Sequence, residues 1–322
     1  MTAFLAPEIA VAIALRETPR EALVPIPVGD VSRRRQLHES ALAATDTSVA
    51  PGVSTKDFHI ASADGTPILC RWYQRDQSAH SAPSAAIVYF HGGGYILGSV
   101  DLFDGVCSRY VAACDVPILS VDYRLAPEHP FPSSLEDAYA ALDWLHSHAS
   151  TLNVDIRRVA VMGDSAGGGL AASLVHYALR KNGPRIAKQI LIYPMLDDLT
   201  TFSDCPVASA REILTWTEDD NETGWTALLG SRSERSPDLP AWAAPARMTV
   251  VPKGMPDTCM EIAELDLFRQ EGERYAARLA DANVAVELRY RKGCPHGWEH
   301  LAPDAAATRE AMDDRYRAIR AL

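Results

Sequence analysis

The stretch Gly163-Asp164-Ser165-Ala166-Gly167 decides the fold of this chain. The apolar run Arg158-Val-Ala-Val-Met162 precedes it, and the helical pattern Gly168-Gly-Leu-Ala-Ala-Ser-Leu174 follows it. Strand, sharp turn and helix in this order form the context in which a G-x-S-x-G motif lifts a serine above a sheet edge. The glycines let strand and helix cross closely, and the helix N-terminus favours a developing negative charge. The pattern predicts Ser165 as a nucleophile.

Short apolar runs alternate with helical patterns along the rest of the chain. Residues 54–75 are typical of a hairpin, and later apolar runs begin at Ala85, Pro117, Val159, Gln189, Thr258 and Val284. Helical patterns occupy residues 102–114, 134–149, 167–181, 269–282 and 303–321. Runs that are apolar on both faces suit a parallel sheet covered by helices. The alternation therefore predicts an α/β fold with a mostly parallel central sheet flanked by helices.

Two stretches, residues 1–50 and 199–242, depart from this rhythm. The second is polar and contains Trp216, Trp225 and Trp242. An insertion of this kind between strands predicts a helical cap over the carboxyl edge of the sheet, where ligands bind in open α/β folds. We therefore expect residues 1–50 and 199–242 to form the N-terminal and inserted parts of the cap. The two parts of the catalytic domain are then 51–198 and 243–322.

The N-terminal segment predicts an amphipathic helix, because Ile9, Ala12 and Ile13 share one helical face. It carries Glu8 and has neither a basic start nor a small-residue cleavage site, so we do not expect a signal peptide. It is also too short to span a bilayer and lacks a cationic face. We expect this helix to cover a pocket, and the protein to be cytoplasmic, without stable membrane insertion.

Composition limits the partners of the chain. It has 322 residues, 47% of them hydrophobic, and 31 basic against 42 acidic residues give a net charge of −11. A nucleic-acid partner is not expected, because phosphate binding needs a basic surface. The six cysteines show no C-x-x-C spacing, which favours free thiols over a redox site, a disulfide framework or a metal site. No metal and no cofactor are expected.

A glycine loop follows the run Ile87-Val-Tyr-Phe90. It reads His91-Gly-Gly-Gly-Tyr95. Acyl transfer develops an oxyanion, which backbone N–H groups reach only where no side chain intrudes. In a strand–turn–helix fold such a loop works with the amide after the nucleophile, here that of Ala166. The alternative, a flexible glycine turn, explains the loop less well beside the downstream serine motif.

A serine hydroxyl needs a base, and the base needs an acid that orients it. In this strand–turn–helix context the chain order is serine, acid, histidine. His176 follows the serine turn too soon, whereas His296 lies in a turn after the last apolar run and is the preferred base. His300 is the alternative.

Three acidic residues compete for the orienting role. Glu261, Glu264 and Asp266 lie in or just after the run Thr258–Ala263. Asp266 falls between that run and a helix beginning near Phe268, where it could also cap the helix. The stretch from Asp266 to His296 has room for one helix and one strand. Asp266 is preferred, with Glu264 as the alternative.

These motifs together resemble the hormone-sensitive-lipase family of bacterial esterases, within the α/β-hydrolase superfamily. The resemblance covers roughly residues 55–322 and includes several motifs in the family's order. The matching segments are 91–94, 123–132, 163–167, 192–194, 264–268, 271–272 and 296–298. The family implies an α/β-hydrolase fold with a cap and cleavage of acyl esters without a metal.

The resemblance also implies roles for single residues. Ser165 is then the nucleophile, Asp266 the orienting acid and His296 the base, while the amides of Gly93, Gly94 and Ala166 form the oxyanion hole. His91, Arg124 and Glu128 are expected to hold loops in place. The chain departs from the family at Leu267, where proline is frequent, at Gln270, usually acidic, and in a longer segment at 251–256. These departures concern loop geometry.

The sequence predicts a carboxylesterase that hydrolyses short- to medium-chain acyl esters of small molecules through an acyl-enzyme. Two other classes stay open: a ligand receptor on the same scaffold, and another enzyme such as a dehydratase or an amidase. Retention of His296 argues against a receptor. An exposed edge strand near residues 284–290 offers a surface for a homodimer.

Overall fold

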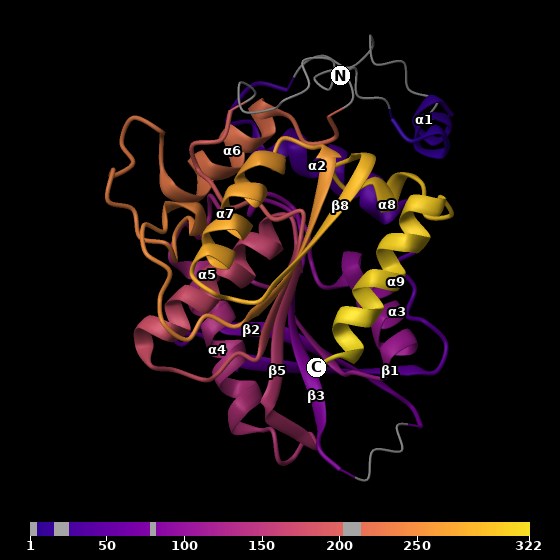
Figure 1. Ribbon diagram of the computed structural model, residues 1–322, viewed down its shortest axis with the longest axis vertical. Coiled ribbons are helices and arrows are strands. Elements are labelled where there is room, and N and C mark those ends of the chain that lie inside the picture. Colours follow the sequence, from indigo (N-terminus) through magenta and orange to yellow (C-terminus); the bar gives the residue numbers. More distant parts are fainter. Residues whose placement is uncertain (1–4, 16–25, 78–81, 202–213) are drawn as a thin grey trace.

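A single sheet forms the centre of the molecule (Figure 1). The computed structural model describes residues 5–15, 26–77, 82–201 and 214–322. These residues form an eight-stranded sheet in the order β1-β2-β4-β3-β5-β6-β7-β8, antiparallel at β1–β2 and β2–β4 and parallel from there on. The predicted mostly parallel sheet is confirmed. Its strands are β1 (Val53–Ala61), β2 (Pro67–Arg75), β3 (Ser84–Phe90), β4 (Ile118–Val121), β5 (Val154–Asp164), β6 (Lys188–Ile192), β7 (Asp257–Leu265) and β8 (Val286–Pro295).

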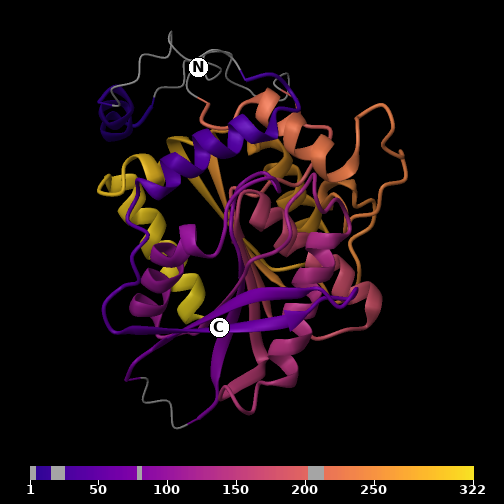
Figure 2. The same cartoon turned by 180° about the vertical axis from the view of Figure 1, so that it is seen from behind.

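Helices cover both faces of the sheet (Figures 1 and 2). One layer contains α4 (Ser133–Ser147), α5 (Ala166–Lys181) and α7 (Arg269–Asp281). The other contains α3 (Asp104–Cys114) and α9 (Ala306–Arg320). The remaining α-helices are α1 (Pro7–Ala14), α2 (Val31–Ala43), α6 (Glu218–Leu229) and α8 (Trp298–Leu301). The helical patterns at 102–114, 134–149, 167–181, 269–282 and 303–321 match α3, α4, α5, α7 and α9 within a few residues.

The alternation of side chains along β3 explains why the sheet needs both layers. All seven residues of β3 are buried. Val88 and Phe90 pack in the core that contains α4, α5 and α7, whereas Ile87 and Tyr89 pack in the core with α3 and α9. Successive side chains of a strand point to opposite faces, so a strand that is apolar throughout is stable only between two layers.

Two helices that are far apart in the sequence meet above the carboxyl end of the sheet (Figure 2). The buried guanidinium of Arg34 on α2 donates from Nε to the Asp220 carboxylate on α6 at 2.7 Å. Asp220 also completes the N-terminal cap of α6 with Thr217. The described parts of the stretches 1–50 and 199–242 are therefore in contact.

The first helix, α1, has the predicted amphipathic character. Ile9 is fully buried against the core that contains α3 and α9, and Ala12 and Ile13 pack there too. Val11 on the other side is 58% exposed. In the part of the chain that the structure describes, no helix is long and apolar enough to span a bilayer.

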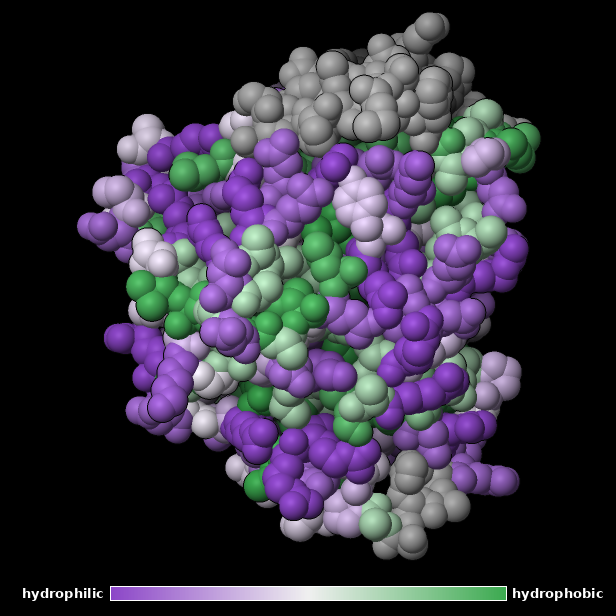
Figure 3. All heavy atoms as spheres, in the orientation of Figure 1, coloured by the Kyte–Doolittle hydropathy of each residue, from purple (hydrophilic) through white to green (hydrophobic). Residues whose placement is uncertain are grey.

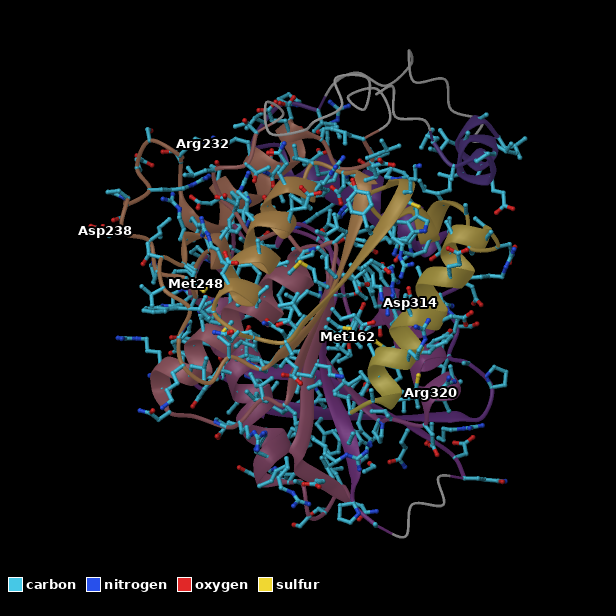
Figure 4. All side chains as sticks on the ribbon, viewed as in Figure 1. Met162, Arg232, Asp238, Met248, Asp314 and Arg320 are labelled. Carbon is cyan, nitrogen blue, oxygen red and sulfur yellow. The ribbon has the colours of Figure 1, made fainter. Side chains whose placement is uncertain are left out.

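A buried charge network fixes the edge of the sheet that carries β7 and β8. Glu261 on β7 accepts from Arg291 of β8 at 2.8 Å and pairs with Arg315 of α9 at 2.5 Å. Arg291 also reaches Asp314 at 2.7 Å, on the helix that lies beside β8 (Figure 4). Glu261 is thus paired with two arginines, and among the described contacts its carboxylate makes no hydrogen bond to Ser165 or His296.

The described cysteines are free, as the sequence predicts. Cys70, Cys107, Cys259 and Cys294 are buried and Cys114 is half-buried, while Cys205 lies outside the described residues. Burial raises the pKa of the Cys294 thiol to about 12. Hydrophilic side chains cover most of the face seen in Figure 3, with apolar patches between them.

The buried imidazole of His176 predicts a pH-dependent contribution to stability. It lies in α5 at 3.1 Å from the Tyr275 hydroxyl, and burial lowers its pKa to about 4. Between about pH 6.5 and 4 the unfolded chain binds a proton that the folded chain does not. The free energy of unfolding therefore decreases as the pH is lowered through this window. His176→Gln removes this component, worth up to a few kcal/mol. Urea unfolding of both proteins from pH 7 to 4 measures it, and parallel profiles would contradict it.

Candidate active site

Ser165 occupies a strained turn between β5 and α5. Its φ is 55° and its ψ is −119°, a conformation that L-residues rarely adopt. Hydrogen bonds hold the turn on both sides, because the Ser165 amide donates to the Ile192 carbonyl and its carbonyl accepts from Met195, each at 2.9 Å. The side chain consequently stands at the carboxyl end of β5 and at the N-terminus of α5.

Two glycines of the motif are required by close backbone contacts. A Cβ atom at Gly163 would overlap the backbone of Gly167, and one at Gly167 would overlap the carbonyl of Phe90 on β3. Strand β5, helix α5 and the end of β3 therefore approach one another more closely than any side chain permits. The G-x-S-x-G pattern predicts this crossing correctly.

The predicted serine, histidine and acid lie in one hydrogen-bonded chain. His296 Nε2 lies 2.8 Å from Ser165 Oγ, and His296 Nδ1 lies 2.7 Å from Asp266 Oδ2. An ionised carboxylate only accepts hydrogen bonds, so Nδ1–H donates to Asp266 and Nε2 accepts from the serine hydroxyl. Asp266 and His296 follow β7 and β8 directly, so three strand ends supply the three side chains. The arrangement allows the imidazole to take the hydroxyl proton.

Asp266 also binds the backbone of its own loop. Its Oδ1 accepts from the Phe268 amide at 3.0 Å, next to the start of α7. Helix α7 has Phe268 at its N-cap position and no side-chain cap hydrogen bond, so the expected capping role of Asp266 is not found. The contacts of Asp266 with Phe268 and His296 use different oxygens. With 1% of its surface exposed, the carboxylate is shielded from water.

The alternative acid and base lie elsewhere. Glu264 accepts a hydrogen bond from the Gly293 amide at 2.7 Å and so fixes the end of β8, just before His296. His300 borders the same pocket as Ser165 but packs edge-on against Phe103, with centroids 6.2 Å apart. Burial lowers its pKa. Neither residue is hydrogen-bonded to the chain of Ser165, His296 and Asp266 among the described contacts.

The glycine loop after β3 lies beside the serine. A Cβ atom at Gly94, whose φ is +58°, would overlap the Trp216 ring. The buried His91 ring stacks on Tyr123, with ring centroids 4.3 Å apart. Its Nδ1 lies 2.8 Å from the Gly92 carbonyl oxygen of the same loop. Among the described residues, no acceptor is hydrogen-bonded to the amides of Gly93 and Gly94, and Gly93 lines the pocket beside Ser165.

Arg124 and Glu128, which are expected to hold loops in place, both form ion pairs. Arg124 binds the buried Asp137 carboxylate at 2.7 Å and Asp64 at 2.6 Å. Glu128 pairs with Arg35 of α2 at 2.6 Å. These ion pairs tie the loop after β4 to its neighbours.

A pocket of about 460 Å³ lies above Ser165, within the range of small-molecule sites. Its walls are mainly apolar and come from α2 and from the segment before α6. Among the described residues, no group of three His, Cys, Asp or Glu side chains could hold a metal ion. The pocket is lined by Ile13, Leu37, His38, Ala41, Leu42, Gly92, Gly93, Leu97, Phe103, Asp164, Ser165, Tyr193, Leu214, Thr215, Trp216, His296, Gly297, His300 and Leu301.

Sequence reasoning did not identify the residues that surround the imidazole. Tyr193 and Phe268 contact His296 edge-on, with ring centroids 4.7 and 5.1 Å away. Thr215 donates to the His296 carbonyl at 2.5 Å. Tyr193 belongs to the segment Ile192-Tyr-Pro194, which matched the family without revealing a role. Of the three tryptophans in the inserted stretch, only Trp216 lines the pocket.

Comparison with known proteins agrees with this architecture. Residues 87–300 match the family described as having the alpha/beta hydrolase fold. Esterase LipI of Mycobacterium tuberculosis is 34% identical over 280 residues, which are 85% of this chain and 84% of that protein. Ethyl acetate hydrolase of Pseudomonas putida is 32% identical, with 92% of each chain covered.

Solved structures give the same result. A bacterial heroin esterase superimposes with a TM-score of 0.86 at 32% identity, covering 98% of this chain and 97% of that one. An esterase of Pyrobaculum calidifontis superimposes with a TM-score of 0.83 at 31% identity, covering 98% of each chain. The chain belongs to the α/β-hydrolase family, and its resemblance to the hormone-sensitive-lipase group is confirmed.

Proposed function

We propose that the protein is a serine carboxylesterase that hydrolyses short- to medium-chain acyl esters of small molecules. The observation that carries this proposal is the 2.8 Å contact between His296 Nε2 and Ser165 Oγ at the floor of an apolar pocket. The names of the relatives, an esterase and an ethyl acetate hydrolase, support ester substrates.

The first half-reaction transfers the acyl group to the enzyme. His296 Nε2 takes the proton of Ser165, and Oγ forms a bond to the ester carbonyl carbon. The carboxylate of Asp266 stabilises the imidazolium that results and keeps its orientation. His296 then protonates the alcohol oxygen as the bond between that oxygen and the carbonyl carbon breaks, which leaves an acyl-Ser165.

Backbone amides stabilise the charge that develops on the carbonyl oxygen. We assign this role to Gly93, Gly94 and Ala166, because the glycine amides are unpaired within the described structure and Ala166 begins α5. Such donors act mainly on the transition state, and each is worth about 3 kcal/mol of barrier. Because α5 starts beside them, its dipole adds to the same effect.

The stretches 1–50 and 199–242 are proposed to form the cap, with 51–198 and 243–322 as the catalytic domain. Support comes from the pocket walls, which use Leu37 of α2 and Trp216 before α6. The size of the acyl group that fits is then set by these two segments and not by the sheet. Apolar walls favour aliphatic and aromatic acyl groups.

Two further expectations concern the whole protein. A cytoplasmic location remains a prediction from the sequence. A homodimer through the edge strand β8 also remains a prediction, supported by Leu288 and Tyr290, which are 42% and 40% exposed on that strand. An unpaired strand edge is a template for pairing with a second chain.

Replacing the nucleophile tests the proposal directly. Ser165→Ala should lower kcat for p-nitrophenyl butyrate by roughly 10⁴-fold or more, because no acyl-enzyme can form. Ser173→Ala is the matched control, since Ser173 is also buried in α5 but lies outside the pocket. It should keep wild-type activity.

The outcome that would contradict this function is also clear. If wild-type protein cleaves no ester from acetate to laurate, or if folded Ser165→Ala cleaves them at the wild-type rate, the serine esterase proposal is wrong. Mass spectrometry of a trapped acyl-enzyme gives an independent measurement at Ser165.

A second prediction separates the two acid candidates. Asp266→Asn should lower kcat by about 10⁴-fold, because the amide cannot hold the imidazole in the reactive tautomer. Glu264→Gln keeps an acceptor for Gly293 and should cost less than about tenfold. Steady-state kinetics on one ester measures both, and similar losses in the two variants would refute the assignment of Asp266.

A third prediction concerns the acyl pocket. Leu37→Trp fills space above Ser165 and should lower kcat/KM for p-nitrophenyl hexanoate relative to acetate by about tenfold. Ser32→Trp is the control, because Ser32 is exposed on the same helix and lines no described pocket. An unchanged hexanoate-to-acetate ratio in Leu37→Trp would show that α2 does not limit the acyl group.

A further inference from the structure

A second cavity, the polar cavity, lies on the other side of the wall behind Ser165. It has a volume of about 730 Å³ and is bordered by α3, α8 and α9. Among the described residues, Asp164 and His300 line both this cavity and the active-site pocket. Its other walls carry charged side chains such as Arg109, Glu299 and Arg315, in contrast to the apolar pocket above Ser165.

Asp164 presents an unpaired oxygen at this wall. Its Oδ2 accepts from the Tyr89 hydroxyl at 2.6 Å, while Oδ1 is buried and has no hydrogen-bond partner among the described residues. Only 3% of the residue is exposed. Burial raises the pKa of this carboxyl to about 7.

Glu299 repeats the pattern deeper in the polar cavity. Its Oε1 accepts from Tyr193 at 2.6 Å and pairs with Arg315 at 2.8 Å. Its Oε2 is buried and likewise lacks a partner within the described part of the chain. Buried acceptors without a protein partner are normally satisfied by ordered water. Both free oxygens therefore indicate bound water in the polar cavity.

The second half-reaction, hydrolysis of the acyl-Ser165, requires a water molecule. Once Ser165 carries an acyl group, that group lies in the apolar pocket, whose walls offer few polar atoms to guide a water molecule. Hydrolysis then needs a water molecule beside His296, which a polar route from behind the wall can supply.

We propose that the polar cavity admits the hydrolytic water to the acyl-enzyme, with Asp164 and Glu299 as positioning residues. The inference rests on the proposed function. Water gives a proton to His296 Nε2 while its oxygen bonds to the acyl carbon. The bond between that carbon and Ser165 Oγ then breaks, and His296 returns the proton to Oγ. The carboxylic acid leaves, and no further reactant is required.

Filling the polar cavity with larger side chains tests this route and leaves Ser165, His296 and Asp266 unchanged. Met312→Trp on α9 and Val106→Phe on α3 each add side-chain volume to its lining, from two different helices. Glu310→Trp is the matched control, because Glu310 is exposed on the same helix as Met312 and does not line the cavity. Two independent plugs keep the test decisive if one variant fails to fold, which circular dichroism detects.

The measurement is the partition of the acetyl-enzyme between two acceptors. Each protein is given p-nitrophenyl acetate and benzyl alcohol, an aromatic nucleophile that suits the apolar pocket and not the charged walls of the polar cavity. The ratio of benzyl acetate to acetate is determined by chromatography. This ratio is set after acylation and is insensitive to the amount of active enzyme. The plugged variants should raise it about threefold, whereas Glu310→Trp should leave it unchanged.

Two outcomes separate this inference from the proposed function. If folded plugged variants release p-nitrophenol and keep the wild-type ratio, water enters through the mouth of the apolar pocket and the inference is wrong. If release of p-nitrophenol by the wild type does not depend on Ser165, the serine esterase mechanism itself fails, whatever the ratio.

Discussion

The strained backbone at Ser165 is the constraint on which the rest of the structure depends. A non-glycine residue in this conformation costs about 1–3 kcal/mol and persists only where its surroundings hold it. Here the hold comes from Ile192 and Met195, which bind the serine backbone, and from the crossing of β5 and α5 at Gly163 and Gly167. The sheet, the helix layers and the loop after β6 therefore all serve to keep one side chain raised.

The position of the imidazole depends on a different region. Asp266 and His296 follow β7 and β8, whose pairing is fixed from below by the ion pairs of Glu261 with Arg291 and Arg315. Removing one partner from a buried ion pair leaves an uncompensated charge and is strongly destabilising. Helix α9 thus contributes to the geometry of the site although most of it lies far from the serine. A general base that must remain within hydrogen-bond reach of its partner needs this kind of rigid support.

Local patterns explain why so much of the fold could be predicted. The motif at Ser165 and the glycines after β3 determine the path of their own backbone. The turn and the close backbone approach can therefore be predicted from residues that are adjacent in the sequence. The structure joins Ser165 to His296 and His296 to Asp266 by hydrogen bonds, because the order of strands brings their loops to the same edge. Tyr193 was missed, because a contact between its ring and His296 joins residues more than 100 positions apart and leaves no local pattern. For the same reason nothing in the sequence indicated the unpaired oxygens of Asp164 and Glu299.

The ion pair between Arg34 and Asp220 has a consequence for how this enzyme can diversify. It joins two residues that are 186 positions apart in the sequence, and both residues are buried. A segment around α6 exchanged for that of a relative would leave Arg34 buried beside a foreign surface, unless α2 were exchanged with it. We therefore expect recombination to change the substrate range only when both stretches around the pocket are exchanged together, since exchange of one alone breaks this buried ion pair. The sheet beneath them, with Ser165, Asp266 and His296, can stay the same throughout.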